Sequence, residues 1–549
     1  MTVGYRPRSV SATPPQLSVA EAMRHSGMYP GRPEVIVRET HTAWIFLAGE
    51  RAYKVKKPVR MAFLDFSTLE RRRAVCHEEV RVNAPLAASL DMRVRSLVAQ
   101  DGSYVLAEAD APDAVEYAIE MRRFDEEQTM AALVRRGELR DDHVRAVARR
   151  LAEFHAQAAT LAPSDPLGDL KRTRDHNARE LLALADDATA RRILAADRFT
   201  NAFLVARRGE VEGRAAAGRI RDGHGDLRAE HVVLEAPLAI VDRLEFDARL
   251  REIDVADDLA FLVMDLERLG AGPHAALLVA AYREAGGDPG GDGLIAFHAT
   301  YRALVRAKVD LLRADQLDAP AASRAARAEA EELLDLAERF AWRARGPLVL
   351  AIGGPPACGK STLAAQLAGR SGWPVLSSDA LRKLTRGIDL TQAAPDDDYA
   401  PAARAAVYRE LGERAGAAVA AGDGVIVDAT FGEPALRGAF LDGIGDRRAL
   451  RAVECHTPAA LRARWARKRT PQTAQGSDAR PDVAAQLGAR HTGWEELPEE
   501  MILTVRPGAG AAFAVDQIAD WLDTRSLAGD KAAQPCANAD DASRSRGDG

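Results

Sequence analysis

A short apolar run followed by a glycine-bounded loop decides how the C-terminal third of this 549-residue chain folds. Residues 347–362 read Pro-Leu-Val-Leu-Ala-Ile-Gly-Gly-Pro-Pro-Ala-Cys-Gly-Lys-Ser-Thr, which contains the pattern G-x-x-x-x-G-K-[ST]. A predicted strand leads into the loop, and Leu363-Ala-Ala-Gln-Leu continues it as a helix, which is the context this motif needs. The glycines let backbone N–H groups face phosphate oxygens, and the helix adds its positive N-terminal end. The stretch therefore predicts a phosphate-binding loop.

Each position of this loop has a predicted task. Gly354 and Gly359 shape the backbone, and Lys360 neutralises the β- and γ-phosphates of a bound nucleotide. Ser361 holds Mg²⁺ through its hydroxyl, and Thr362 completes the set of nucleotide-binding residues. We therefore expect ATP and Mg²⁺ as cofactors of this part of the chain.

Two acidic residues follow apolar strands beyond the loop. Asp379 ends the stretch Val375-Leu-Ser-Ser-Asp, one turn before Arg382, and could accept the proton of a substrate hydroxyl. The alternative is that Asp379 caps a helix. Asp428 ends Gly424-Val-Ile-Val-Asp and would hold Mg²⁺ through water, or be a carboxylate at a strand end without that task.

A basic helix follows, with Arg467 among its arginines and a lid-like segment over residues 472–480 behind it. Arginines on a lid can stabilise charge on a phosphoryl group in transfer, so Arg467 is a catalytic candidate. The alternative is a solvated helix face.

Together these motifs resemble the small P-loop kinases grouped as zeta-toxin-like or polynucleotide-kinase-like, AAA-type ATPases. The resemblance covers about residues 347–525. It implies an α/β P-loop NTPase fold with a parallel sheet, and phosphoryl transfer to a small hydroxyl acceptor.

A second constellation lies far upstream. Residues 221–231 read Arg-Asp-Gly-His-Gly-Asp-Leu-Arg-Ala-Glu-His, and an apolar strand ends at Asp242 soon afterwards. One carboxylate in a short loop and another at a strand end is the arrangement for phosphoryl transfer in kinase-like folds.

The segment resembles the aminoglycoside phosphotransferase and choline-kinase-like family, whose loop reads H-G-D-L-x-x-x-N. By that resemblance Asp226 is the catalytic carboxylate and Asp242 holds the metal. His231 stands where the family has a metal-binding Asn, and imidazole is a poor ligand for Mg²⁺. Four alternatives therefore stay open: the site uses His231 as a ligand, uses one metal, relies on Glu230, or is slow or inactive.

The same resemblance places an ATP-anchoring lysine in Tyr53-Lys-Val-Lys-Lys. Lys54 is favoured, but Lys56 lies on the same strand face and stays open. Glu79 or Glu78, on a helix predicted over residues 69–83, would pair with it. The alternative is a solvated lysine on an edge strand.

The chain divides, by these patterns, into a flexible arm (1–16), a kinase-like α+β phosphotransferase domain (17–345), a P-loop domain (347–525) and a disordered tail (526–549). The first domain begins with an antiparallel meander over residues 35–57, followed by the helix and two more strands near 94–99 and 103–108. From there it is expected to be mainly helical to about residue 210, and again over 254–340.

The composition of the chain excludes some classes of binding partner and site from our expectations. The net charge is −6, whereas proteins that grip a phosphate backbone are usually basic, so nucleic acid is not the expected partner. The four cysteines form no CxxC pair, and no stretch approaches the roughly 18 apolar residues of a membrane span. We expect a cytoplasmic protein.

The leading hypothesis is an enzyme with two ATP-dependent phosphotransferase modules that act on hydroxyl groups of small molecules. A second hypothesis makes the first domain a regulatory nucleotide-binding module, because of His231. A third makes the P-loop domain a polynucleotide 5′-hydroxyl kinase, which the acidic net charge disfavours.

Overall fold

The computed structural model describes residues 18–40, 42–60, 64–100, 103–389, 392, 395–468 and 491–529. By its contacts the chain forms two compact units: unit 1 is Met1–Pro163 with Arg214–Gly290, and unit 2 is Ser164–Gly213 with Gly291–Gly549. The helices of residues 164–213 and 291–345 thus group with the P-loop part of the chain. The domain junction expected after residue 345 stays a prediction.

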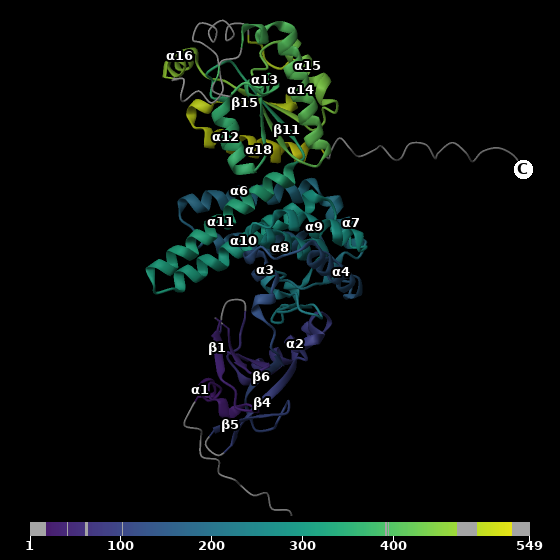
Figure 1. The fold of residues 1–549 in the computed structure, drawn as a ribbon, viewed down its shortest axis with the longest axis vertical. Coiled ribbons are helices and arrows are strands. Elements are labelled where there is room, and N and C mark those ends of the chain that lie inside the picture. Colours follow the sequence, from purple (N-terminus) through teal and green to yellow (C-terminus); the bar gives the residue numbers. More distant parts are fainter. Residues whose placement is uncertain are drawn as a thin grey trace, which may run out of the picture. The chain divides into compact units, whose positions relative to one another are not determined.

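Unit 1 begins with a six-stranded antiparallel sheet in the order β1-β2-β3-β6-β4-β5 (Figure 1). Its strands are β1 (Val35–Glu39), β2 (Ala43–Ala48), β3 (Arg51–Lys56), β4 (Arg93–Gln100), β5 (Ser103–Ala107) and β6 (Ala114–Arg122). The predicted meander is confirmed, because β1 pairs with β2 and β2 with β3, both antiparallel.

Strand β6 corrects the expectation that residues after 108 are mainly helical. It pairs with both β3 and β4 in the middle of the sheet. Glu116 and Glu120 are buried in it and interrupt the apolar pattern of a central strand. Arg72 donates to Glu116 at 2.9 Å and Arg93 donates to Glu120 at 3.0 Å, so both carboxylates are satisfied by residues distant in sequence.

Helices and short strands complete unit 1. The helix predicted from Leu69 is α2, which continues to Ala87 and packs on the sheet through Cys76. The other helices are α1 (Val19–Ala22), α3 (Met130–Arg136), α4 (Asp141–Gln157), α8 (Val255–Arg268) and α9 (Gly272–Glu284). Two small antiparallel sheets pair β7 (Ile220–Asp222) with β10 (Glu252–Asp254), and β8 (Val232–Val233) with β9 (Ala239–Ile240). Helix α7 (Arg208–Ala216) leads into β7.

Unit 2 is built on the predicted parallel sheet, in the order β12-β13-β11-β14-β15. All four strand pairs are parallel. The strands are β11 (Val349–Gly353), β12 (Val375–Ser377), β13 (Val425–Asp428), β14 (Leu450–Cys455) and β15 (Ile502–Val505). The helices are α5 (Pro166–Leu182), α6 (Asp187–Ala206), α10 (Asp292–Gln316), α11 (Pro320–Arg345), α12 (Lys360–Ser371), α13 (Ser378–Arg386), α14 (Pro401–Ala420), α15 (Pro434–Ile444), α16 (Ala459–Lys468) and α18 (Ala511–Gly529). Helix α18 continues beyond the domain end expected at residue 525.

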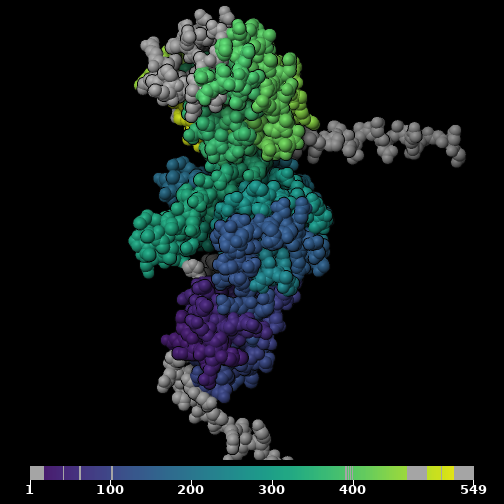
Figure 2. Space-filling view, in the orientation of Figure 1, coloured from purple at the N-terminus to yellow at the C-terminus, as the bar shows by residue number. Residues whose placement is uncertain are grey.

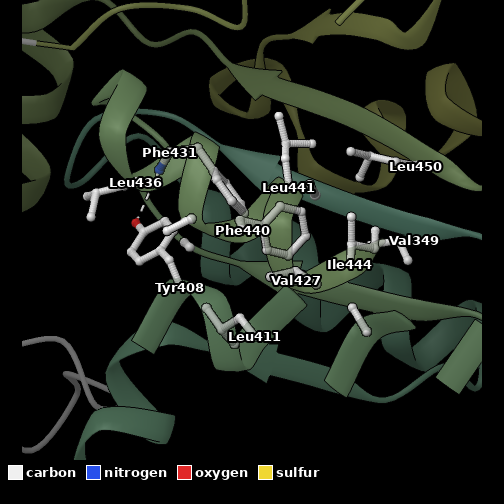
Figure 3. Packing of buried hydrophobic residues seen from close by; sticks show 14 of the residues in the cluster. Val349, Tyr408, Leu411, Val427, Phe431, Leu436, Phe440, Leu441, Ile444 and Leu450 are labelled. Atoms are coloured by element: carbon white, nitrogen blue, oxygen red, sulfur yellow. Dashed lines mark hydrogen bonds between the residues drawn. The ribbon is translucent and has the colours of Figure 1, made fainter. Parts of the chain in front are cut away.

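Successive residues of β11 point to opposite faces of this sheet, and each face has its own core. Val349 packs with α14 and α15, where Phe431 and Phe440 lie edge to face with ring centroids 5.0 Å apart (Figure 3). Leu350 packs on the other face, against α12 and α18. Helices α14 and α15, in green, form part of the outer surface of this unit (Figure 2). Among the described helices, none combines the length and the apolar character that a membrane crossing needs.

Candidate active sites

The phosphate-binding loop of unit 2 lies at the carboxyl ends of parallel strands. Asp428, the last residue of β13, is in register with Ile352 of β11 and with Ser377 of β12. The loop between β11 and α12 therefore starts beside Asp428, and its first N–H, from Gly354, donates to the carbonyl of Thr430 at 3.0 Å. This edge is where ligands bind in open parallel sheets.

The two motif glycines are required by backbone geometry. Gly354 has φ 139° and Gly359 has φ 98°, both in the region that favours glycine. A Cβ at Gly354 would lie 2.7 Å from the Cys358 sulfur and 2.8 Å from the Cys455 carbonyl oxygen. The loop therefore has its predicted shape because no larger residue fits there.

Lys360, Ser361 and Thr362 begin helix α12, directly after the loop. Lys360 is buried and its ammonium donates to the Pro355 carbonyl at 3.1 Å, which curls the side chain over the loop. Ser361 and Thr362 lie in the first turn of α12, and Asp428 is only 8% exposed. The loop, a lysine, a hydroxyl and a carboxylate thus share one edge of the sheet.

Asp379 lies in the first turn of α13 and accepts a hydrogen bond from Arg382 at 2.8 Å. The helix cap is Ser377, whose hydroxyl faces the Ala380 N–H, so the alternative interpretation of Asp379 as the cap is wrong. Arg467 belongs to α16, but its side chain and the lid predicted over 472–480 lie outside the described residues.

A small cleft beside the loop includes Arg404, Glu433 and His491, which the sequence did not indicate. It is lined by Pro355, Pro356, Arg404, Thr430, Gly432, Glu433 and His491. Arg404 and Glu433 form a 2.9 Å ion pair, and burial lowers the pKa of His491. These residues come from separate elements, so no local motif joins them.

In unit 1, three predicted residues meet although they are far apart in the chain. The Lys54 ammonium, on β3, lies 2.8 Å from Glu79 of α2 and 2.8 Å from Asp242. The positive charge of Lys54 holds the pKa of Asp242 well below its ordinary range. Strand β3 lies between β2 and β6, so the alternative of a solvated lysine on an edge strand is wrong.

Lys56 takes a different place in the same cluster. Its ammonium lies 2.5 Å from Glu79 and 2.5 Å from Glu245, and its side chain is 2% exposed. Glu78 points elsewhere, to Arg81 at 2.6 Å. The geometry therefore distinguishes the alternatives left by the sequence. Glu79, and not Glu78, contacts both lysines, and of the two lysines Lys54 contacts Asp242.

The loop that carries Asp226 is held by a buried carboxylate. Asp258 accepts hydrogen bonds from the backbone N–H of His224 at 2.6 Å and of Gly225 at 3.0 Å, and it lies 3.0 Å from His155. Burial lowers the pKa of His224 to about 4, so this imidazole is neutral at pH 7. The loop is therefore fixed by charge and hydrogen bonds rather than by the motif alone.

At the end of this loop, Asp226 meets a residue that the sequence analysis did not single out. Arg228 donates from Nε to Asp226 at 3.1 Å and from Nη2 at 3.1 Å. His231 lies 2.8 Å from the Asp226 carbonyl through Nδ1, 3.0 Å from Arg228 through Nε2 and 3.8 Å from Asp242. The motif spacing gave the position of Arg228, but not its side-chain direction.

Of the two metal ligands predicted in unit 1, Asp242 and His231, only Asp242 offers the oxygen donor that a hard cation prefers. Asp242 offers oxygen, is half exposed, and has φ 59°, which turns it out of the strand direction. His231 offers a nitrogen that already faces Arg228. Among the described residues, no group of three or more His, Cys, Asp or Glu side chains is arranged to hold a metal ion. Asp242 is thus the residue that would hold Mg²⁺ in unit 1.

Comparison with known proteins gives a match to one family model and to a relative that is similar over most of the chain. Residues 349–493 match the family model described as "AAA domain". A protein of Mycobacterium tuberculosis (strain ATCC 25618 / H37Rv), named "Uncharacterized protein Rv2004c", is 34% identical over 475 residues, which cover 84% of this chain and 91% of the relative.

Two solved structures are similar to separate parts of the chain. An aminoglycoside phosphotransferase from Alicyclobacillus acidocaldarius is 14% identical, with coverage of 61% of this chain and 98% of the other, and a TM-score of 0.33. A gluconokinase from Sinorhizobium meliloti 1021 is 18% identical, with coverage of 34% and 98%, and a TM-score of 0.25.

The fold and the motif thus define a class of protein in which an α+β unit with a six-stranded antiparallel sheet is joined, in one chain, to an α/β unit with a parallel sheet and a phosphate-binding loop that matches the AAA domain model. Within that class, the chain belongs to the family of the mycobacterial protein Rv2004c.

Proposed function

We propose that this protein is an ATP-dependent phosphotransferase with two nucleotide-binding modules, each acting on a hydroxyl group of a small molecule. The observation that carries the proposal is the meeting of Lys54, Glu79 and Asp242 at 2.8 Å, because three residues from separate elements converge as nucleotide anchoring requires. Such chemistry depends on positioning and electrostatics rather than on a reactive side chain.

In unit 1, Lys54 would bind the nucleotide phosphates and Asp226 would orient the acceptor hydroxyl. The hydroxyl oxygen forms a bond to the γ-phosphorus, the bond from that phosphorus to the bridging oxygen breaks, and ADP leaves. The hydroxyl proton passes to the Asp226 carboxylate. When bound at Asp242, Mg²⁺ would neutralise charge on the phosphates.

In unit 2, Lys360 and the backbone of the loop would bind the phosphates, while Ser361 and Asp428 would hold Mg²⁺. Asp379 would accept the hydroxyl proton, with Arg382 fixing its carboxylate at 2.8 Å. Arg467 stays a candidate for charge stabilisation. We expect cytoplasmic small molecules as substrates and, given the net charge of −6, no nucleic acid.

A second candidate function makes unit 1 a regulatory nucleotide-binding module. His231 in the position of the family's Asn favours it, because unit 1 then lacks one oxygen ligand for a metal. This candidate predicts that unit 1 binds ATP without turnover.

One experiment separates the two. Mg²⁺-dependent ATP consumption is measured with a pooled panel of hydroxylated metabolites for the wild type, Lys360→Ala and Asp226→Ala. Arg448→Ala, a change at a 91% exposed side chain outside both sites, is the matched control. If each active-site variant loses a separate part of the activity, both units are kinases. If Asp226→Ala loses nothing, unit 1 is not an active kinase under these conditions and the regulatory candidate replaces our proposal for it.

A further inference from the structure

The guanidinium of Arg228 is held at the centre of the unit 1 site. Its nitrogens lie 3.1 Å from each oxygen of the Asp226 carboxylate, and Nη1 also donates to Glu230. The side chain is 14% exposed, so the charge is largely removed from water. A permanent cation therefore lies beside the carboxylate that would receive the acceptor hydroxyl.

His231 fixes this cation in place. Its Nδ1 lies 2.8 Å from the Asp226 carbonyl oxygen, which can only accept, so Nδ1 carries the ring proton. Nε2 then has a lone pair, and it accepts from Arg228 Nη2 at 3.0 Å. An imidazole in this tautomer acts as an acceptor for arginine, and the same nitrogen is not available to a metal.

We propose that Arg228 supplies the positive charge that a second metal ion would otherwise supply in unit 1, and that His231 is the positioning residue that holds Arg228 there. The inference rests on the proposed function of unit 1. In this proposal, the histidine at position 231, where the resembled family has Asn, belongs to a site that binds a single divalent ion at Asp242.

The charges of the site support one ion rather than two. Two fixed cations already contact the carboxylates of the site: Lys54 contacts Asp242 and Glu79, and Arg228 contacts Asp226 and Glu230. A second divalent ion near Asp226 would meet the guanidinium at close range and be repelled. Arg228 contacts Asp226 at 3.1 Å, whereas Asp242 lies 3.8 Å from the His231 Nε2 that accepts from Arg228.

The test counts bound ions rather than turnover. The full-length Lys360→Ala chain, in which unit 2 binds nucleotide weakly, is mixed with a non-hydrolysable ATP analogue and titrated with Mn²⁺. Free Mn²⁺ is followed by electron paramagnetic resonance. We expect one bound Mn²⁺ per chain. Adding the change Asp242→Ala should remove this ion, and any Mn²⁺ that the double variant still binds is counted as an ion of unit 2.

Two variants of His231 discriminate positioning from a merely structural role. His231→Asn keeps a donor to the Asp226 carbonyl, removes the acceptor that holds Arg228, and adds an oxygen ligand, so we expect the count to rise from one to two. His231→Gln reaches the position of Nε2 and can still accept from Arg228, so the count should stay at one. Circular dichroism and the melting temperature confirm that each variant folds.

Two bound Mn²⁺ in the Lys360→Ala chain would overturn this inference and leave the proposed function of unit 1 standing. A count of one in a folded His231→Asn variant would do the same. If the parent chain binds no nucleotide in unit 1, the proposed function of that unit fails and the inference falls with it. The parent count decides the question even if both variants fail to fold.

Discussion

Lys54 and Lys56 occupy neighbouring places in one buried ion network, and replacing each with Met should have different consequences. Lys54 lies 2.8 Å from Asp242, the residue we expect to face the nucleotide and its metal, and is 15% exposed. Lys56 lies between Glu79 and Glu245 and is 2% exposed. Methionine keeps most of the volume of each side chain and removes only the charge.

The magnitudes follow from these contacts. A hydrogen bond to a charged group contributes about 1.5–3 kcal/mol, so Lys54→Met should weaken nucleotide binding by about 10- to 150-fold. Lys56→Met leaves Glu245 buried without its ammonium, and breaking a buried pair costs about 3–5 kcal/mol of stability. Glu79 would still have Lys54 at 2.8 Å, so we expect the loss of stability in Lys56→Met to lie near the lower end of this range.

The assay is calorimetric titration of an ATP analogue into the Lys360→Ala chain, with and without each change, together with urea denaturation. We expect Lys54→Met to lose affinity with the smaller loss of stability, and Lys56→Met to show the larger loss of stability. If Lys56→Met abolishes binding while remaining folded, and Lys54→Met binds normally, our assignment of the anchoring lysine is wrong.

Three further predictions concern other contacts. Burial lowers the pKa of His224 from 6.5 to about 4. Between these values His224 binds more protons in the unfolded chain than in the folded one, so acidification from pH 6.5 to 5 should cost about 1.5 kcal/mol of stability through this group; an equal urea-midpoint shift in His224→Gln would contradict this. Gly354→Ala should cost about 1–3 kcal/mol because φ is 139° and the new Cβ would meet the Cys455 carbonyl; an unchanged melting temperature refutes it. Asp379→Asn removes the carboxylate that would accept the hydroxyl proton, so turnover by unit 2 should fall about 10²- to 10⁴-fold. Because Asn keeps an acceptor for Arg382, nucleotide affinity should stay constant; retained turnover in steady-state kinetics would show that Asp379 is not a catalytic residue.

The local parts of both sites could be predicted from the sequence. The loop at Gly354–Thr362 follows from backbone freedom and from a strand-loop-helix pattern, which are properties of adjacent residues. The meander over residues 35–57 also required no tertiary information, because it follows from alternating residues and a turn. Lys54, Asp226 and Asp242 were indicated by the resemblance of their segments to a known family.

Other features were decided only by the tertiary structure. Strand β6 lies in the middle of the sheet with its buried glutamates paired to Arg72 and Arg93, and neither pairing can be seen in the strand itself. Adjacent helical residues differ in direction by about 100°. Packing of α2 on the sheet therefore decided that Glu79, rather than Glu78, meets the lysines.

The same limit applies to Arg228 and His231. Their residue types and spacing are visible in the sequence, but an arginine side chain can reach many partners. The buried carboxylate of Asp258 fixes the loop, and the fixed loop then lets His231 direct Arg228 to Asp226. The sequence thus determined which chemical groups are present, and the long-range packing of separate elements determined which of them meet.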